Sequence, residues 1–263
     1  MTENFLERAN LLEREAHELR SRIRNEEAFV KFDKAASLYS KASEYLKAAL
    51  CFASAASCWN IHTGHQPLRN AASRNALAAR EALKAGHYDY ARSLFGEAAI
   101  LYEKEGDFGK FSDCFYRSKH AEAKFSWAIF ARGRKDQLEE TGTFSGTERV
   151  AAFARWVMST ANRLIWGYGE RPFRTFLVAL FIITVSAALY ALSGQIRTSG
   201  EIRPISLLEG LYMSVITYTT VGFGDYLPVG WTRGWAMLEA LSGIFFAPLF
   251  LVALTRRYLR MYR

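Results

Sequence analysis

Cysteine is scarce in the sequence and poorly placed for cross-links. The 263 residues include three cysteines, Cys51, Cys58 and Cys114, all in the polar first half and none in a CxxC pair. An odd number with this spacing argues against a disulfide framework. We predict that all three are small, buried apolar residues in a reducing compartment.

Signals for export and for catalysis are absent as well. The first 24 residues are charged throughout and lack the apolar core of a signal peptide, so we expect the first half to stay in the cytosol. The five histidines show no metal-ligand spacing with cysteine or carboxylate, and no phosphate-binding loop or nucleophile elbow is present. The sequence therefore predicts a protein that is not an enzyme and has no cofactor.

Apolar and charged residues are unevenly divided along the chain. The formal net charge is +8 and the mean hydropathy is −0.06, but apolar residues concentrate after Pro172 and charge is dense before Lys135. A basic protein can bind nucleic acid, or it can be a membrane protein with basic cytoplasmic flanks. The apolar runs of the second half favour the membrane protein, with lipid and not nucleic acid as its partner.

One pattern recurs in the first half: a large apolar residue, then two alanines, then an aromatic. Small residues let a neighbouring helix approach closely, so each copy predicts one packing face of a helical repeat. We expect helices near 4–24, 26–40, 43–60, 68–85, 88–105 and 108–131, with breaks at 62–64, 85–86 and 105–107. The copies are Phe32-x-x-Ala35-Ala36-x-Leu38-Tyr39, Phe52-x-x-Ala55-Ala56-x-Cys58-Trp59 and Phe95-x-x-Ala98-Ala99-x-Leu101-Tyr102.

The third copy is preceded by Ala85-Gly86-x-Tyr88-x-x-Ala91, and residues 26–131 resemble tetratricopeptide-type or SNAP-like repeats. The resemblance implies a cytoplasmic helical-repeat domain over 1–132 with a surface for a peptide, protein or small-molecule regulator. The alternative is a domain that packs only against itself, because every repeat helix needs an apolar face in either case.

A linker and a basic amphipathic helix are expected next. Residues 133–148 are rich in Gly, Thr and charge, which predicts a loop. Over 149–171, apolar residues recur at i+3 and i+4 with arginines on the other side, and Trp156 and Trp166 precede an apolar run. This pattern predicts a helix in the membrane interface; the alternative is a last packing helix of the first domain. The apolar positions are Val150, Phe153, Val157, Ala161, Leu164 and Ile165, and the basic ones are Arg149, Arg155 and Arg163.

Two apolar runs in the last third approach the length needed to cross a membrane. Thr175 to Leu192 carries no charge, and Trp235 to Leu254 carries only Glu239. An acid within a span is costly and usually functional, so we predict a supporting role for Glu239. Arginines flank the two runs on their outer sides, which predicts a multi-pass protein of the cell (inner) membrane with both termini cytoplasmic. The connector holds a third apolar stretch, 207–218, that is too short to span.

This short stretch is followed directly by Thr219-Thr220-Val221-Gly222-Phe223-Gly224-Asp225. Between two spans and behind a short helix, the segment resembles the selectivity filter of potassium channels of the prokaryotic two-transmembrane type, over about Pro172 to Tyr258. The resemblance implies an all-α, tetrameric pore domain at 172–263. Its expected parts are spans at 173–192 and 233–257, a re-entrant pore helix at 206–218 and the filter at 220–224.

The resemblance also assigns roles to residues. Gly222 and Gly224 permit the unusual backbone of a filter. Gly243 matches the family's hinge glycine, and Pro248 cannot donate to the carbonyl of Ile244, so the second span should bend there. The carbonyls expected to hold K+ are those of Thr220, Val221, Gly222 and Phe223, and Gly224 completes the filter. The residues expected to support the filter are Thr219, Asp225 and Glu239, and the Val221 side chain should pack outward on the pore helix. The residues expected to line the inner pore are Ile244, Ala247, Leu251 and Thr255.

Two residues depart from the family pattern. Phe223 stands where most members have Tyr, which keeps the carbonyl but removes a hydroxyl that can brace the filter. Ile216 stands where some bacterial relatives carry an acid opposite Asp225, so Asp225 must find another partner. The sequence thus predicts a subunit of a homotetrameric potassium channel, with K+ as the permeant ion and a front domain that biases opening. The alternatives are a weakly selective cation channel and a membrane-anchored helical-repeat adaptor whose pore does not conduct.

Overall fold

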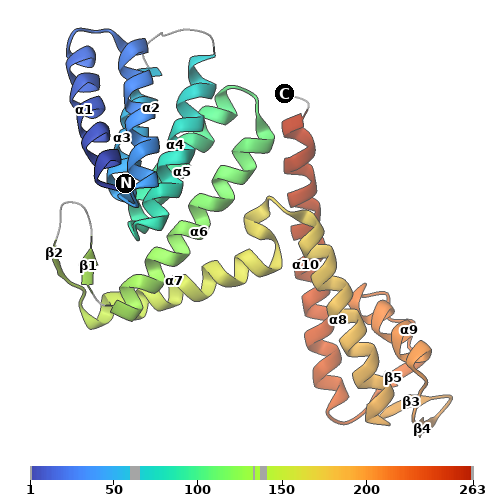
Figure 1. Ribbon diagram of the computed structural model, residues 1–263. Helices are drawn as coiled ribbons and strands as arrows, with labels where there is room; N and C mark the ends of the chain where they lie inside the picture. The colour runs from blue at the N-terminus through green and yellow to red at the C-terminus, as the bar shows by residue number, and fades with distance from the viewer. Residues whose placement is uncertain (1, 60–65, 133, 137–140, 262–263) are drawn as a thin grey trace. The chain divides into compact units, whose positions relative to one another are not determined.

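The computed structural model describes residues 2–59, 66–132, 134–136 and 141–261 (Figure 1). The described chain is mostly helical and divides into two compact units, residues 1–161 and 162–262. The mostly helical fold predicted from the sequence is therefore confirmed.

Six consecutive helices form the main part of the first unit. Each packs against the next along the chain, and Figure 1 shows them as neighbouring ribbons from blue to green. All six predicted helices are present, as a bundle of consecutively packed helices. They are α1 (Thr2–Ser21), α2 (Asn25–Lys41), α3 (Tyr45–Trp59), α4 (Pro67–Lys84), α5 (Tyr88–Lys104) and α6 (Phe108–Arg132).

The repeated sequence pattern forms the interior of this unit. Phe32, Phe52 and Phe95 are at most 6% exposed, and the alanine pairs that follow them are at most 3% exposed. Because alanine adds little width, neighbouring backbones come close and the rings fill the remaining space. The three cysteines are free and buried, as predicted.

Glycine supplies two of the predicted breaks. Gly86 (φ +83°) and Gly106 (φ +78°) adopt the left-handed conformation that ends a helix and that glycine tolerates best. The third predicted break, at 62–64, lies outside the described residues.

The segment expected to be a loop contains structure. Strand β1 (Arg134–Asp136) pairs antiparallel with β2 (Thr141–Thr143). Threonine favours extended backbone, and this signal is weak beside the glycine and charge that predicted a loop. Helix α7 (Gly146–Ile165) begins at Gly146 and not at 149, because Ser145 and Glu148 form a reciprocal cap. The Ser145 N–H donates to the Glu148 carboxylate at 2.7 Å, and the Glu148 N–H donates to the Ser145 hydroxyl at 3.3 Å.

One side of α7 packs against the end of α6. The ring centroids of Trp127 and Trp156 are 4.7 Å apart, and those of Phe130 and Phe153 are 4.8 Å apart. The Arg149 guanidinium donates to the carbonyl oxygen of Phe130 at 2.9 Å. Trp156, expected in the membrane interface, is therefore a packing residue of the first unit, because the same apolar spacing serves either purpose.

Another side of α7 remains exposed and apolar. Val150, Val157 and Leu164 recur at every seventh residue and are 45–69% exposed. The helix thus combines packing against α6 with an uncovered apolar stripe.

The second unit holds two apolar helices, α8 (Pro172–Ser193) and α10 (Thr232–Met261). Pro172–Ser193 and Thr232–Thr255 are long and apolar enough to cross a membrane. The short helix α9 (Leu207–Tyr218) packs against both of them (orange in Figure 1). The chain enters α8 through a single 3-10 turn, η1 (Gly167–Gly169), which contacts α8 and α10.

A small antiparallel sheet joins these helices, where an all-α fold was expected. Its central strand β3 (Ile196–Thr198) pairs with β4 (Glu201–Arg203) on one side and β5 (Tyr226–Pro228) on the other. Ser199 (φ +53°) and Gly200 (φ +89°) form the two-residue turn between β3 and β4. Strands of three residues are too short for alternation to reveal them in a sequence.

Candidate functional site

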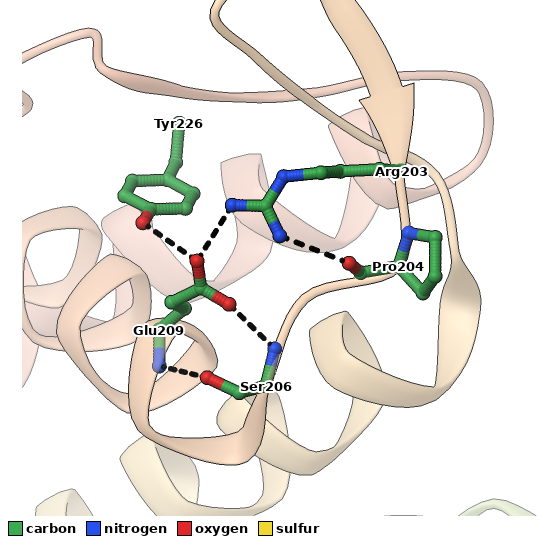
Figure 2. A network of polar contacts seen from close by, with 5 residues as sticks. All are labelled: Arg203, Pro204, Ser206, Glu209 and Tyr226. Atoms are coloured by element: carbon green, nitrogen blue, oxygen red, sulfur yellow. Dashed lines mark hydrogen bonds and ion pairs between the residues drawn. The ribbon is translucent and has the colours of Figure 1, made fainter.

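The short helix α9 begins with a reciprocal cap. The Ser206 hydroxyl accepts from the Glu209 N–H at 3.3 Å, and the Glu209 carboxylate accepts from the Ser206 N–H at 2.7 Å (Figure 2). This Ser-x-x-Glu cap fixes the start of the helix at Leu207. The helix then ends at Tyr218, directly before the Thr219–Asp225 motif.

Two glycines let α9 lie close to the apolar helices. A Cβ added to Gly210 in α9 would lie 2.5 Å from the carbonyl oxygen of Ala187 in α8. A Cβ added to Gly243 in α10 would overlap the carbonyl oxygen of Tyr218 at the other end of α9. Helix α9 is thus packed closely near both of its ends by contacts within the single chain. Gly243 has this packing role whatever part it plays as a hinge, which remains a prediction.

Glu239 links all three helices of the second unit. It is 2% exposed, and its carboxyl group accepts a hydrogen bond from the Tyr190 hydroxyl of α8 at 2.6 Å. The same carboxyl group contacts the Ser214 hydroxyl of α9. Ser186 of α8 is a further hydrogen-bond partner and itself accepts from the Trp235 indole N–H at 2.9 Å. The acid that the sequence placed in the second span therefore faces the neighbouring helices.

The segment after α9 alternates in backbone handedness. Thr220 (φ +60°), Gly222 (φ +52°) and Gly224 (φ +82°) are left-handed, and the intervening Val221 and Phe223 are not. Successive carbonyls of an extended chain point to opposite sides, whereas alternating handedness can turn them to the same side. Glycine provides this at two positions, as predicted. Thr220 is β-branched, and a positive φ there is the kind of strain that functional segments store.

The inner end of this segment is tied to α9. The carbonyl oxygen of Ile216 accepts from the N–H groups of Val221 at 2.9 Å and Gly222 at 3.1 Å. Val221 and Phe223 are nevertheless 54% and 70% exposed in the single chain. The expected packing of Val221 on the pore helix is therefore incomplete within the single chain.

Asp225 has a partner that the sequence did not reveal. Ile216, the expected opposite residue, is buried and apolar. The Asp225 carboxylate instead accepts hydrogen bonds from the Tyr212 hydroxyl of α9 and from the Tyr226 N–H, the latter at 3.1 Å. The Tyr212 ring also meets the Tyr226 ring edge-on, with centroids 5.7 Å apart. Tyr212 thus supplies the contact that Ile216 cannot make.

A further polar network surrounds Glu209. One of its carboxylate oxygens accepts from the Arg203 guanidinium at 2.7 Å and from the Tyr226 hydroxyl at 3.2 Å (Figure 2). The hydrogen bond from Arg203, followed by that from the Ser206 N–H, lowers the pKa of Glu209 to about 2. Glu209 is therefore a carboxylate at neutral pH. Of this network, only the Ser-x-x-Glu spacing before an apolar stretch could have been recognised from sequence.

The predicted inner-pore residues share one exposed face of α10. Ile244 and Leu251 are 56% and 62% exposed, and Ala247 and Thr255 are exposed on the same side. Gly243 and Ala253 lie on the packed side. The helix runs through Pro248 without interruption, so the bend expected there remains a prediction.

Residues 177–260 match a family model described as ion channel. The match begins within α8 and extends through α9, the alternating segment and most of α10. The second unit is therefore the ion channel domain of a membrane protein, and the matched family is one of channels and not of enzymes. No curated protein and no solved structure matches the chain.

Proposed function

We propose that the chain is one subunit of a homotetrameric, potassium-selective channel. The observation that carries the proposal is the alternating backbone of residues 220–224, directly behind α9 and inside the segment that matches the ion channel family. Four such segments around one axis would replace the water of a K+ ion with rings of carbonyl oxygens. These rings would come from Thr220, Val221, Gly222 and Phe223, with the Thr220 hydroxyl completing the innermost one.

The surroundings of this segment favour a cation. The C-terminal end of a helix carries partial negative charge, and α9 ends immediately before the segment. Thr219 and Asp225 bracket the segment, and Glu239 holds α9 against the apolar helices. We assign these three residues to filter support. The side chains of Val221 and Phe223, which are exposed in the single chain, are left for neighbouring subunits to cover.

The exposed face of α10 is proposed to line the inner pore. Four copies of Leu251 would close the inner mouth by excluding water. Leu251→Ala and Leu251→Asn should raise the leak through the closed channel, whereas Val252→Ala, at an exposed neighbour on another face, should not. An unchanged leak in both Leu251 variants would remove this residue from the gate.

The helical first unit is proposed to regulate opening from the cytoplasm. It joins the channel domain through α7, whose exposed apolar stripe suits a membrane interface, and η1 touches both membrane helices. A peptide, protein or small molecule bound to the helical unit could therefore bias the pore. Deleting residues 1–145 should change the open probability; unchanged gating would leave the unit as an assembly element.

The decisive experiment is the reversal potential of the purified protein in planar bilayers, with potassium on one side and sodium on the other. The expected value lies near the potassium equilibrium potential. A reversal near zero would favour the weakly selective cation channel. Gly222→Ala, which puts a side chain on left-handed backbone, should abolish selective current and is the matched control. If neither the wild type nor Leu251→Asn carries current, the non-conducting adaptor is the better description.

A further inference from the structure

The chain that leaves the alternating segment is held as a strand. Residues Tyr226–Pro228 form β5, which pairs with β3 so that Tyr226 lies opposite Thr198. The Val229 N–H continues the contact by donating to the carbonyl oxygen of Gln195 at 3.0 Å. The exit of the segment is therefore fixed to chain that follows α8, far away in the sequence.

Glu209 gathers hydrogen-bond donors from three parts of the outer region. Arg203 comes from β4, the Ser206 N–H from the start of α9, and the Tyr226 hydroxyl from β5 (Figure 2). Arg203 also donates to the carbonyl oxygen of Pro204 at 3.3 Å. One carboxylate thus ties the hairpin, the helix and the exit strand together.

These contacts give the segment an anchor at each end. At the inner end, the Ile216 carbonyl oxygen holds the N–H groups of Val221 and Gly222. At the outer end, Tyr226 lies two residues beyond Gly224 and is held by its strand pairing and by Glu209. The position of Tyr226 therefore sets where the outer half of the segment can lie.

We propose that Arg203, Glu209 and Tyr226 form an outer clamp that positions the chain leaving the filter and keeps the outer half of the filter in its conducting arrangement. The proposal rests on the proposed potassium-channel function and adds positioning residues that lie outside the filter. The side chains of Arg203 and Glu209 are 46% and 27% exposed. An exposed pair contributes little to global stability, so the effect of the clamp is local.

The test compares variants that open the clamp with one that spares it. Arg203→Gln, Glu209→Gln and Tyr226→Phe each remove donors or acceptors of the clamp. Arg197→Gln is the matched control, because Arg197 is an exposed arginine of the same sheet, opposite Leu227, whose loss leaves all three donors to Glu209 in place. Current is recorded during maintained opening at low and at high outer potassium.

The clamp variants should lose current faster at low outer potassium, by about three- to tenfold, the kinetic equivalent of one hydrogen bond. High outer potassium should slow this loss, because bound ions stabilise the conducting filter by mass action. The Arg203→Gln/Glu209→Gln double variant should match the Glu209→Gln single variant, since both act on one contact. Arg197→Gln should behave as the wild type. Equal time courses in all variants, or an Arg197→Gln effect equal to that of Arg203→Gln, would overturn the proposal.

Hydrogen exchange separates this proposal from the proposed channel function. In the full-length protein in detergent, the amides of residues 226, 227 and 229 should exchange faster in Glu209→Gln than in the wild type or Arg197→Gln. If exchange is faster in Glu209→Gln but the wild type carries no selective current, the clamp is a structural contact and its role in conduction is overturned. Unchanged exchange in Glu209→Gln would overturn the clamp itself.

Discussion

Replacing Glu239 tests whether this buried acid acts through hydrogen bonds. Ser214 has one hydroxyl hydrogen but lies within bonding distance of two acceptors, the carbonyl oxygen of Ile183 (2.9 Å) and the Glu239 carboxyl group. A glutamine side chain of the same shape can keep both contacts, because its carbonyl oxygen can accept from Tyr190 while its amide donates to Ser214, which then donates to Ile183. Glu239→Gln should therefore match the wild type in stability and conduction, whereas Glu239→Ala should fold with reduced stability.

The cost of Glu239→Ala follows from the groups that it leaves behind. The Tyr190 hydroxyl belongs to a side chain that is 0% exposed, and it loses an acceptor 2.6 Å away. An unsatisfied buried hydroxyl costs about 1–3 kcal/mol, and lost packing around the vacated volume adds about 1–2 kcal/mol. The expected loss is about 2–5 kcal/mol. Tyr190→Phe removes the orphaned hydroxyl, so the double variant should fall short of additivity by about 0.6–1.7 kcal/mol, the range for hydrogen bonds inside membranes.

The assay is equilibrium unfolding in mixed detergent micelles, followed by tryptophan fluorescence, for the wild type, both Glu239 variants, Tyr190→Phe and the double variant. The potassium-to-sodium permeability ratio of the same proteins reports whether α9 still holds the filter. Strictly additive losses in the double variant would refute the hydrogen-bond reasoning. So would a Glu239→Gln protein as unstable as Glu239→Ala, because charge and not hydrogen bonding would then be the property that matters.

Three further outcomes are expected. Gly243→Ala should push the end of α9 away from α10 and lower the potassium-to-sodium permeability ratio; a residue that acts only as a hinge would change the open probability alone. The pKa of Glu209 is lowered to about 2, so its stabilising contacts are complete above the ordinary glutamate pKa of about 4.3 and are lost as the pH falls through about 2. Lowering the outer pH from about 8 to about 5 should therefore leave the protection of the amides of residues 226, 227 and 229 unchanged relative to the unstructured chain at each pH, and a loss of protection in that window would contradict this. Ala98→Leu, at a position that is 0% exposed, should overpack the helical unit by about 1–3 kcal/mol in thermal unfolding and leave permeability unchanged.

The helices could be predicted because their signals are local. Apolar spacing predicts the helices of the first unit, and the glycines at 86 and 106 predict two of the breaks between them. The repeated alanine pairs are buried in its core. The glycines of the alternating segment likewise indicate, by their residue type alone, a left-handed backbone at their positions. In each case, the residue type and the structural demand occur at the same position in the chain.

What could not be predicted depends on partners that are distant in sequence. Tyr190 and Glu239 are 49 positions apart, and neither carries a mark that identifies the other. Trp156 lies on an amphipathic helix, and periodicity shows that one side is apolar without showing whether lipid or α6 covers it. The strand β5 was missed because three residues carry no period, and its pairing with β3 arises only once α8, α9 and α10 are packed.

The packing of α9 within a single chain has a consequence for biosynthesis. Gly210 against Ala187, Gly243 against Tyr218, and Glu239 between α8 and α9 are all contacts of a single chain. In the proposed channel, a newly made chain can therefore enter the bilayer with α9 already docked, before any partner arrives to shelter its non-spanning backbone from lipid. In the proposed tetramer, the four chains complete the lining of the conduction path together. Damage to these contacts would then act first on the monomer, where quality control would reduce the number of channels assembled, and the channels that do assemble would show the loss of selectivity expected for Gly243→Ala.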